Sequence, residues 1–221
     1  MSLEERAKRE KALARAAKAV EGCRKCQIGY TRTNPAYGEG DACARLMLVG
    51  EGPGETEDRL GRPFVGRAGE LLDKMIGAIG LAREEVYICN TVKCRPIFDD
   101  GQRLRNRAPT PDEMSNCRPY LDEQIEIIKP EIILCLGSPA AKSFLGDKFS
   151  ITKQRGIWYE GPRGIPLIAT FHPAYILRMT GGKEMTEVKR LVWNDLKKVR
   201  ARLDEPPPAP PQPDAVQQAL F

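Results

Sequence analysis

The sequence has no long apolar run and only one histidine among its 221 residues. No stretch approaches the roughly 18 apolar residues that a membrane-spanning helix requires, so we expect a soluble protein with no membrane partner. The first twenty residues are rich in Ala, Lys, Arg and Glu and lack the apolar centre of a secretory signal. We therefore expect a cytoplasmic protein whose seven cysteines are reduced, which excludes a disulfide framework.

The cysteines fall into two groups by their surroundings. Three lie in or beside apolar runs and are typical of packing residues: Cys43, Cys89 and Cys135. Four lie in polar, basic segments and are candidate metal ligands: Cys23, Cys26, Cys94 and Cys117. A Cys-x-x-Cys pair with two distant cysteines can complete the ligand shell of zinc or of an iron–sulfur cluster. The spacing favours a metal centre over structural thiols or redox chemistry, and it does not separate zinc from iron.

Charge and proline content divide the chain near its end. The net charge is +5, but residues 204–221 hold three acidic and no basic residues, so residues 1–203 carry +8. A basic body favours a polyanion such as nucleic acid, although a solvated basic surface has the same composition. The proline-rich stretch 206–213 is typical of a linker. We expect one domain over residues 1–203 and a disordered tail over residues 204–221.

Short apolar runs alternate with helical patterns along the body. Residues 45–50, 85–92, 131–137 and 165–170 are typical of buried parallel strands, and helical periodicity follows at 68–79, 110 onward, 138 onward and 183–203. Residues 2–20 favour a further helix that begins with a Ser2 and Glu5 capping box, and the polar segment 97–108 favours a loop. The pattern predicts an α/β fold, a three-layer αβα sandwich with a mainly parallel central sheet of about four strands.

Unusual residues follow three of these strands. Gly-Glu-Gly-Pro-Gly occupies 50–54, Asn90 ends the second strand, and His172 follows the fourth. Because the carboxyl ends of parallel strands meet at one edge, these residues should form one site. The glycine run lacks the full Gly-x-Gly-x-x-Gly spacing, and Pro53 removes an amide that would hold a phosphate, which disfavours a nicotinamide cofactor.

Four distinctive segments occur in order: residues 50–72, Asn-Thr-Val-Lys-Cys-Arg-Pro at 90–96, Cys-Arg-Pro at 117–119, and His-Pro-Ala-Tyr-Ile-Leu-Arg at 172–178. Together they resemble the family 4 (iron–sulfur) uracil-DNA glycosylases. The resemblance covers residues 23–203. It implies a DNA-repair enzyme that flips uracil out of single- or double-stranded DNA and hydrolyses its N-glycosidic bond, leaving an abasic site.

The resemblance also implies roles for individual residues. Phe64 would stack on the uracil ring, and the Asn90 amide would match uracil O4 and N3–H but not cytosine. His172 would donate to uracil O2 as negative charge develops there. Glu51 would position or deprotonate the attacking water. Gly52 stands where other glycosylase families carry a water-holding Asp or Asn, so Glu51 shaping the loop stays open as an alternative.

The cysteine ligands and the DNA contacts are likewise implied by the resemblance. Cys23, Cys26, Cys94 and Cys117 would hold a structural [4Fe-4S] cluster, since hydrolysis of uracil needs no electron. Arg95 and Arg118 would then lie near the DNA backbone, and one of residues 175–178, Arg178 among them, would fill the gap left by the flipped base.

One segment departs from the family pattern. Residues 97–108 form an insert longer than we expect of typical members. Relatives that trap uracil covalently carry an arginine-rich loop with a nucleophilic histidine. Here Arg103, Arg105 and Arg107 are present and the histidine is absent. The sequence therefore favours turnover by a monofunctional enzyme over covalent capture.

Two other function classes fit part of the sequence. A non-catalytic iron–sulfur protein that binds DNA or senses uracil would explain the cysteines and the basic body, but not the three pocket motifs. A zinc-bound nucleic-acid module would explain the cysteines alone, and absorbance near ~400 nm would exclude it.

The end of the sequence carries a short apolar motif. Gln217 precedes the pair Leu220 and Phe221. This resembles the motif that binds the bacterial sliding clamp, although an apolar pair at the end of a tail also occurs by chance. It predicts an enzyme tethered to the clamp and of bacterial origin. Separately, we expect the enzyme to be monomeric and associated with the nucleoid.

Overall fold

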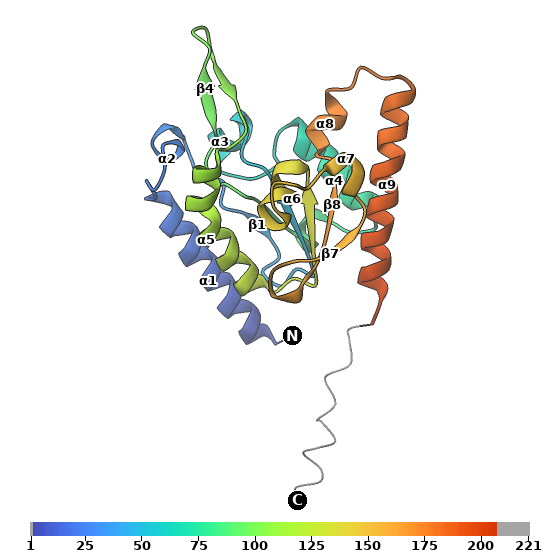
Figure 1. The fold of residues 1–221 in the computed structure, drawn as a ribbon. Helices are drawn as coiled ribbons and strands as arrows, with labels where there is room; N and C mark the ends of the chain where they lie inside the picture. The colour runs from blue at the N-terminus through green and yellow to red at the C-terminus, as the bar shows by residue number, and fades with distance from the viewer. Residues whose placement is uncertain (1, 207–221) are drawn as a thin grey trace, which may run out of the picture.

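The computed structural model describes residues 2–206 of the chain. The larger of its two sheets has the strand order β1-β3-β2-β6-β8-β7 (Figure 1). The four central strands are parallel, and they are β3 (Tyr87–Asn90), β2 (Leu46–Gly50), β6 (Ile132–Leu136) and β8 (Pro166–Thr170). These are the four strands expected from the sequence, which confirms the mainly parallel sheet. The edges are antiparallel and were not expected: β1 (Glu39–Gly40) and β7 (Trp158–Glu160).

Helices cover both faces of this sheet and give the three layers. One layer contains α1 (Leu3–Glu21), α5 (Pro111–Ile128) and α6 (Ser138–Leu145). The other contains α4 (Arg67–Ala78), α8 (Pro173–Leu177) and α9 (Gly182–Asp204). Shorter elements connect them: α2 (Ile28–Thr31), α3 (Glu55–Leu60), α7 (Ile151–Gln154), and the 3-10 turns Arg83–Glu85 and Pro162–Gly164. The expected αβα sandwich is therefore confirmed.

Alternating strand residues build two cores. Met47 and Val49 face α1 and α5, whereas Leu46 and Leu48 face α4 and α9, and all four have exposed fractions of 1% or less. Because both faces are covered, β2 is apolar along its whole length. The cysteines expected to pack do so, since Cys89 and Cys135 are fully buried and Cys43 packs against the first core.

The segment expected to be a loop is a hairpin. β4 (Ile97–Asp99) and β5 (Leu104–Asn106) pair antiparallel and form the second sheet, which projects beyond the body (Figure 1). The sequence expectation was wrong here because the strands are short and largely polar. Their base is held by Arg107, which donates to the Ile97 carbonyl at 3.0 Å and pairs with Glu113 at 2.6 Å.

The chain order places a site at the carboxyl ends of the central strands. From β2 the chain passes to β3 on one side, and later to β6 and β8 on the other. The loops that leave β2 and β6 therefore diverge, which opens a crevice between them. No helix within residues 2–206 is long and apolar enough to cross a membrane.

Candidate active site

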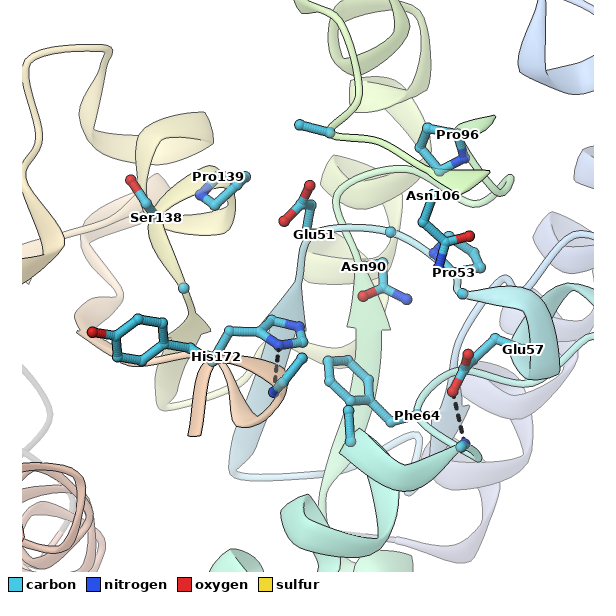
Figure 2. Close-up of a pocket in the computed structure, with 18 of the residues that line it drawn as sticks. Glu51, Pro53, Glu57, Phe64, Asn90, Pro96, Asn106, Ser138, Pro139 and His172 are labelled. Carbon is cyan, nitrogen blue, oxygen red and sulfur yellow. Dashed lines mark hydrogen bonds between the residues drawn. The ribbon is translucent and has the colours of Figure 1, made fainter. Parts of the chain in front are cut away.

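A cavity of about 720 Å³ opens at this edge of the sheet. The residues with expected roles in base recognition and catalysis all line it: Glu51, Gly52, Phe64, Asn90 and His172. They come from the loops after β2 and β8, the end of β3, and the turn before α4. Figure 2 shows the Asn90 amide and the rings of Phe64 and His172 around one space, with Glu51 above them. Chain topology thus gathers segments more than 100 residues apart.

Asn90 presents an unpaired acceptor to this cavity. Its side chain has an exposed fraction of 1%, and its Oδ1 has no hydrogen-bond partner among residues 2–206. A buried acceptor without a donor costs about 1–3 kcal/mol. The backbone of Asn90 is held firmly, because its carbonyl accepts from Lys93 Nζ at 2.7 Å. The backbone that carries this amide is therefore held in place, and the amide oxygen lacks the N–H partner that a ligand could bring.

Two glycines make room for the Phe64 ring and its turn. A Cβ on Gly50 would lie 2.4 Å from both Asn90 Oδ1 and Phe64 Cζ. A Cβ on Gly69 would lie 1.8 Å from the Phe64 carbonyl oxygen. Phe64 itself adopts a left-handed backbone with φ of 51°, which is unfavourable for a bulky residue. The strain is maintained by the surrounding packing, as is common where a side chain must be aimed at a ligand.

Glu57 holds the turn that follows Phe64. Its Oε1 accepts from the backbone N–H groups of Val65 at 3.0 Å and Gly66 at 2.8 Å, as Figure 2 shows for one of them. These bonds satisfy amides at the start of α4 and fix the position of Phe64. Sequence reasoning missed this role. The only signal was a glutamate in the segment that resembles the family.

His172 is oriented by the start of α8. Its Nδ1 accepts from the Ala174 N–H at 3.0 Å, so the neutral ring carries its hydrogen on Nε2. Burial, and to a smaller extent the charge of Arg178, lower the pKa of His172 to about 4. The imidazole is therefore neutral near pH 7, and its Nε2–H is a donor. Its ring lies 5.6 Å from the Phe64 ring, centroid to centroid, at 28°.

Glu51 and Arg178 place opposite charges in the same cavity. Burial raises the pKa of the Glu51 carboxyl, and the charge of Arg178 opposes that rise. The Glu51 backbone carbonyl accepts from the Thr91 side chain and from the Val92 amide at 3.3 Å. The loop after β2 is thereby tied to the segment after β3, and the carboxylate stays available to a water molecule.

Further cavity residues were not expected. Ser138 and Pro139 follow β6, and Asn106 and Arg107 lie at the base of the hairpin. The strand-end argument that indicated Asn90 and His172 would also have indicated Ser138. Nothing in the sequence pattern places the hairpin base beside the cavity.

The three arginines with expected DNA contacts differ in position. Arg178 lines the cavity. Arg95 is close to it and donates to Asn106 at 2.7 Å, which ties it to the hairpin. Arg118 lies on α5, pairs with Asp122 at 2.6 Å and donates to the Ser143 carbonyl at 2.6 Å. The fold does not bring Arg118 to the cavity.

The four candidate ligand cysteines gather beside the cavity loops. Cys94 and Cys117 are buried in one small cluster with Ile28 and Val92, and Cys26 packs against it. Burial raises the pKa of Cys117, the adjacent Lys93 ammonium lowers it, and the Cys26 and Cys23 thiols raise it again. The thiols of Cys26, Cys94 and Cys117 therefore lie within electrostatic range of one another, and that of Cys23 lies within range of Cys26 and Cys117.

Two N–H donors already point at these sulfurs. Arg32 Nη1 donates to Cys94 Sγ at 2.9 Å and to the Cys23 carbonyl at 3.2 Å, and the Lys93 amide donates to Cys117 Sγ at 3.3 Å. Such donors favour thiolates over thiols. Within residues 2–206 no three Cys, His, Asp or Glu side chains are placed to hold a single metal ion.

The chain is similar to known proteins over most of its length. Residues 37–197 match the family model described as the Uracil DNA glycosylase superfamily. The chain is 44% identical over 194 residues to a type-4 uracil-DNA glycosylase of Thermotoga maritima, covering 87% of this chain and 95% of that protein. It is 44% identical over 189 residues to the enzyme of the same name from Sulfurisphaera tokodaii, with 82% and 80% covered. It is 43% identical over 166 residues to the type-4 uracil-DNA glycosylase of Archaeoglobus fulgidus, and the match covers 72% of this chain and 79% of that protein.

Proposed function

Because the chain belongs to the uracil DNA glycosylase superfamily, we propose that its cavity receives a uracil nucleotide flipped out of DNA and that the residues described above cleave the bond between base and sugar. The matches to type-4 enzymes over most of the chain make it a uracil-DNA glycosylase, a DNA-repair hydrolase. A non-catalytic DNA-binding or uracil-sensing protein is not favoured, because the relatives that match over most of the chain are named as glycosylases.

The unpaired Oδ1 of Asn90 carries the proposal. Uracil brings N3–H as a donor to this atom, and its O4 accepts from the Asn90 Nδ2 group. Cytosine presents an acceptor and a donor in the reverse order, so both contacts would fail. In the orientation that the structure shows, the amide would then leave two buried polar groups unpaired, which disfavours cytosine by several kcal/mol, at about 1–3 kcal/mol for each group.

His172 stabilises the leaving base. As the bond between the sugar C1′ and uracil N1 breaks, its electron pair moves onto uracil and negative charge accumulates on O2. The Nε2–H of neutral His172 donates to that oxygen, and Nδ1 stays on the Ala174 amide. The donor is in place before the charge develops, which is the condition for electrostatic stabilisation of the transition state.

Glu51 acts on the water that completes the reaction. The sugar becomes oxocarbenium-like when the base leaves, and water adds to C1′. The raised pKa of Glu51 suits a carboxylate that accepts a proton from this water. Gly52 packs closely against the segment after β3, because a Cβ there would lie 2.8 Å from Val92 Cγ2.

The DNA strand lies across the cavity between two projecting elements. On one side is α8, with Leu177 and Arg178, of which Leu177 is 38% exposed. On the other is the β4–β5 hairpin, where Phe98 is 46% and Leu104 is 53% exposed. Apolar and basic side chains in this arrangement stack on bases and neutralise phosphates. Arg95 supports the hairpin base, and Arg118 contributes to the field of the basic body at longer range.

Cys23, Cys26, Cys94 and Cys117 would hold a [4Fe-4S] cluster. The donor set supports this, because four thiols from three segments meet beside two N–H donors. When bound, the cluster supplies a covalent crosslink between the end of α1, the loop after β3 and α5. It takes no part in the bond cleavage described above.

The tail motif extends the proposal beyond the domain. Gln217, Leu220 and Phe221 lie outside the described residues, as does most of the tail expected over 204–221. Their pattern supports binding to a bacterial sliding clamp by a monomeric, nucleoid-associated enzyme.

Release of free uracil tests the proposed function. The wild type should release uracil from a uracil-containing oligonucleotide, and Asn90→Asp should lower the rate by about 100-fold because the amide donor to O4 is lost. Asn116→Asp, on the exposed surface of α5, is the matched control and should match the wild type. Equal rates for both variants would remove Asn90 from base recognition. No uracil release by the wild type would overturn the function.

A further inference from the structure

Lys93 lies between the cavity and the cysteine cluster with an exposed fraction of 0%. It follows Asn90 by three residues and directly precedes Cys94. Lysine is almost never fully buried unless a charged partner accompanies it. The position of this side chain therefore needs a partner of opposite charge.

The immediate neighbours of the Lys93 ammonium are neutral. Nζ donates to the Asn90 carbonyl at 2.7 Å and to Gln124 Oε1 at 2.6 Å, and it lies 5.6 Å from the centroid of the Tyr37 ring. Gln124 is fixed in this orientation, since its Nε2 donates to the Tyr37 carbonyl at 2.9 Å and to the Tyr87 hydroxyl at 3.0 Å. No carboxylate of residues 2–206 pairs with Lys93. The Lys93 ammonium therefore has hydrogen-bond acceptors, but no carboxylate among residues 2–206 balances its positive charge.

The cysteine cluster lies next to Lys93 along the chain and would supply negative charge when loaded. The Lys93 amide donates to Cys117 Sγ, and Cys94 is the next residue. Four thiolates outweigh the positive charge of an iron–sulfide core, so the loaded group is an anion. A buried cation without a counter-ion therefore lies against the site of a buried anion, and the same cation holds the carbonyl of the residue that reads the base.

We propose that Lys93 is the internal counter-cation of the cysteine-bound iron–sulfur group and that its bond to the Asn90 carbonyl makes it a positioning residue for base recognition. This rests on the proposed function for the identity of both sites. It assigns to one side chain the link between loading of the cluster and the geometry of the uracil pocket.

Three variants of the intact holoprotein separate charge from packing. Lys93→Met removes the cation at similar length. Gln124→Glu keeps the size of the side chain and places a carboxylate against Nζ, which offsets the charge of Lys93; like Gln124→Met, it also loses the N–H contacts with Tyr37 and Tyr87. Gln124→Met removes the same hydrogen bond but leaves the charge in place. The readouts are the reduction potential of the cluster by voltammetry, the rate of iron loss to a chelator, and kcat and KM for uracil release.

The cation favours the more negative, reduced form of the cluster. Lys93→Met and Gln124→Glu should therefore both shift the potential to more negative values and lose iron about tenfold faster, while Gln124→Met keeps the wild-type potential. Lys93→Met should also lower kcat/KM for uracil by about tenfold, because the Asn90 carbonyl loses the hydrogen bond from Lys93 Nζ.

Wild-type potentials in Lys93→Met and Gln124→Glu would overturn the counter-cation role, and so would equal shifts in all three variants, which would indicate packing alone. If Lys93→Met does not fold, the isosteric Gln124→Glu still decides. Unchanged kcat/KM in a folded Lys93→Met would overturn the positioning role. A wild type that holds iron but releases no uracil would refute the proposed function and leave the comparison of potentials intact, whereas a wild type without iron would refute the cluster and this inference together.

Discussion

The neutral state of His172 has a kinetic consequence at the scale of one residue. Its Nε2–H is the donor that the geometry offers to the developing uracil anion. We expect His172→Ala to lower the single-turnover rate of uracil release by about 100-fold or more. DNA affinity, which depends mainly on phosphate contacts, should change little. A near-wild-type rate in the presence of normal binding would remove His172 from catalysis.

The same residue predicts how stability depends on pH. The pKa of His172 falls from 6.5 to about 4 on folding, mainly through burial. Between these two values the unfolded chain binds the proton more readily, so acidification favours unfolding. The stability that neutral His172 contributes to the folded state is complete above pH 6.5 and is lost as the pH falls towards about 4. The melting temperature of the wild type should therefore fall more steeply over this range than that of His172→Gln. Parallel curves would contradict the neutral, buried imidazole.

Gly50 offers a steric test of the site. A Cβ at this position would overlap both the Asn90 amide and the Phe64 ring. We expect Gly50→Ala to lower uracil release by about 100-fold through misplacement of both groups. Gly77→Ala on α4 is the control, because no atom lies within 4 Å of its added Cβ. It should leave activity unchanged and raise the unfolding free energy by about 0.5–1 kcal/mol.

A control with lowered activity, or a Gly50→Ala enzyme with wild-type rates, would contradict this account of the pocket. The measurements are single-turnover kinetics and denaturant unfolding of both variants.

Single residues differ in how far the sequence identifies them. Asn90, His172 and Phe64 stand in segments that resemble a family, and the fold places all three in one cavity. Glu57 and Lys93 could not be identified, because their roles depend on contacts with distant backbone. Lys93 is buried, although lysine side chains usually lie at the surface. Whether a charged side chain is buried depends on the tertiary structure, so a local sequence pattern does not predict it.

At the scale of elements, the hairpin is the feature with the clearest expected effect. Phe98 and Leu104 are both about half exposed and lie on strands whose base lines the cavity. We expect the double variant Phe98→Ser/Leu104→Ser to raise KM for long oligonucleotides by about tenfold with little change in kcat. The reason is that stacking of a base on an apolar side chain contributes about 1–3 kcal/mol. The control Leu3→Ser alters an exposed leucine at the start of α1.

Short uracil-containing oligonucleotides that do not reach the hairpin should show the same KM in the hairpin variant and the wild type. An equal KM for long ones as well would separate the hairpin from DNA binding.

The predictability of elements followed their apolar content. The four parallel strands are continuous apolar runs, and the structure confirms each of them. β1 has two residues and β7 has three, which is too short for any periodicity to appear. β4 and β5 are polar and exposed, so their pairing depends on the turn and on the anchor at Arg107 rather than on a buried face.

At the scale of the whole molecule, the pocket and the end of α9 lie at opposite ends of the sheet. Arg45, which precedes β2, donates to the Leu203 carbonyl at 2.7 Å, so α9 ends beside the amino ends of the strands. The cavity lies at their carboxyl ends. A partner bound to the residues after α9 would thus leave the cavity free.

We expect full-length protein to bind the cognate sliding clamp and a variant lacking residues 217–221 to lose that binding, measured by titration. Release of uracil from short oligonucleotides should be equal in the two proteins, since the tether only raises local concentration on clamp-loaded DNA. Equal clamp affinity of both proteins would remove the motif from this role.

The two edges of the central sheet also bear on how the protein behaves when concentrated. Each edge is an antiparallel strand of two or three residues, and each of these strands pairs beside a glycine or a proline, at Gly40 on β1 and Pro166 opposite β7. Strands this short give a neighbouring molecule few backbone groups with which to extend the sheet. The apolar parallel strands, which would aggregate most readily, lie between them. The order of strands in the sheet therefore shields the four apolar parallel strands from other molecules. We expect the protein to remain free of fibrils at concentrations where an exposed parallel edge strand would nucleate them.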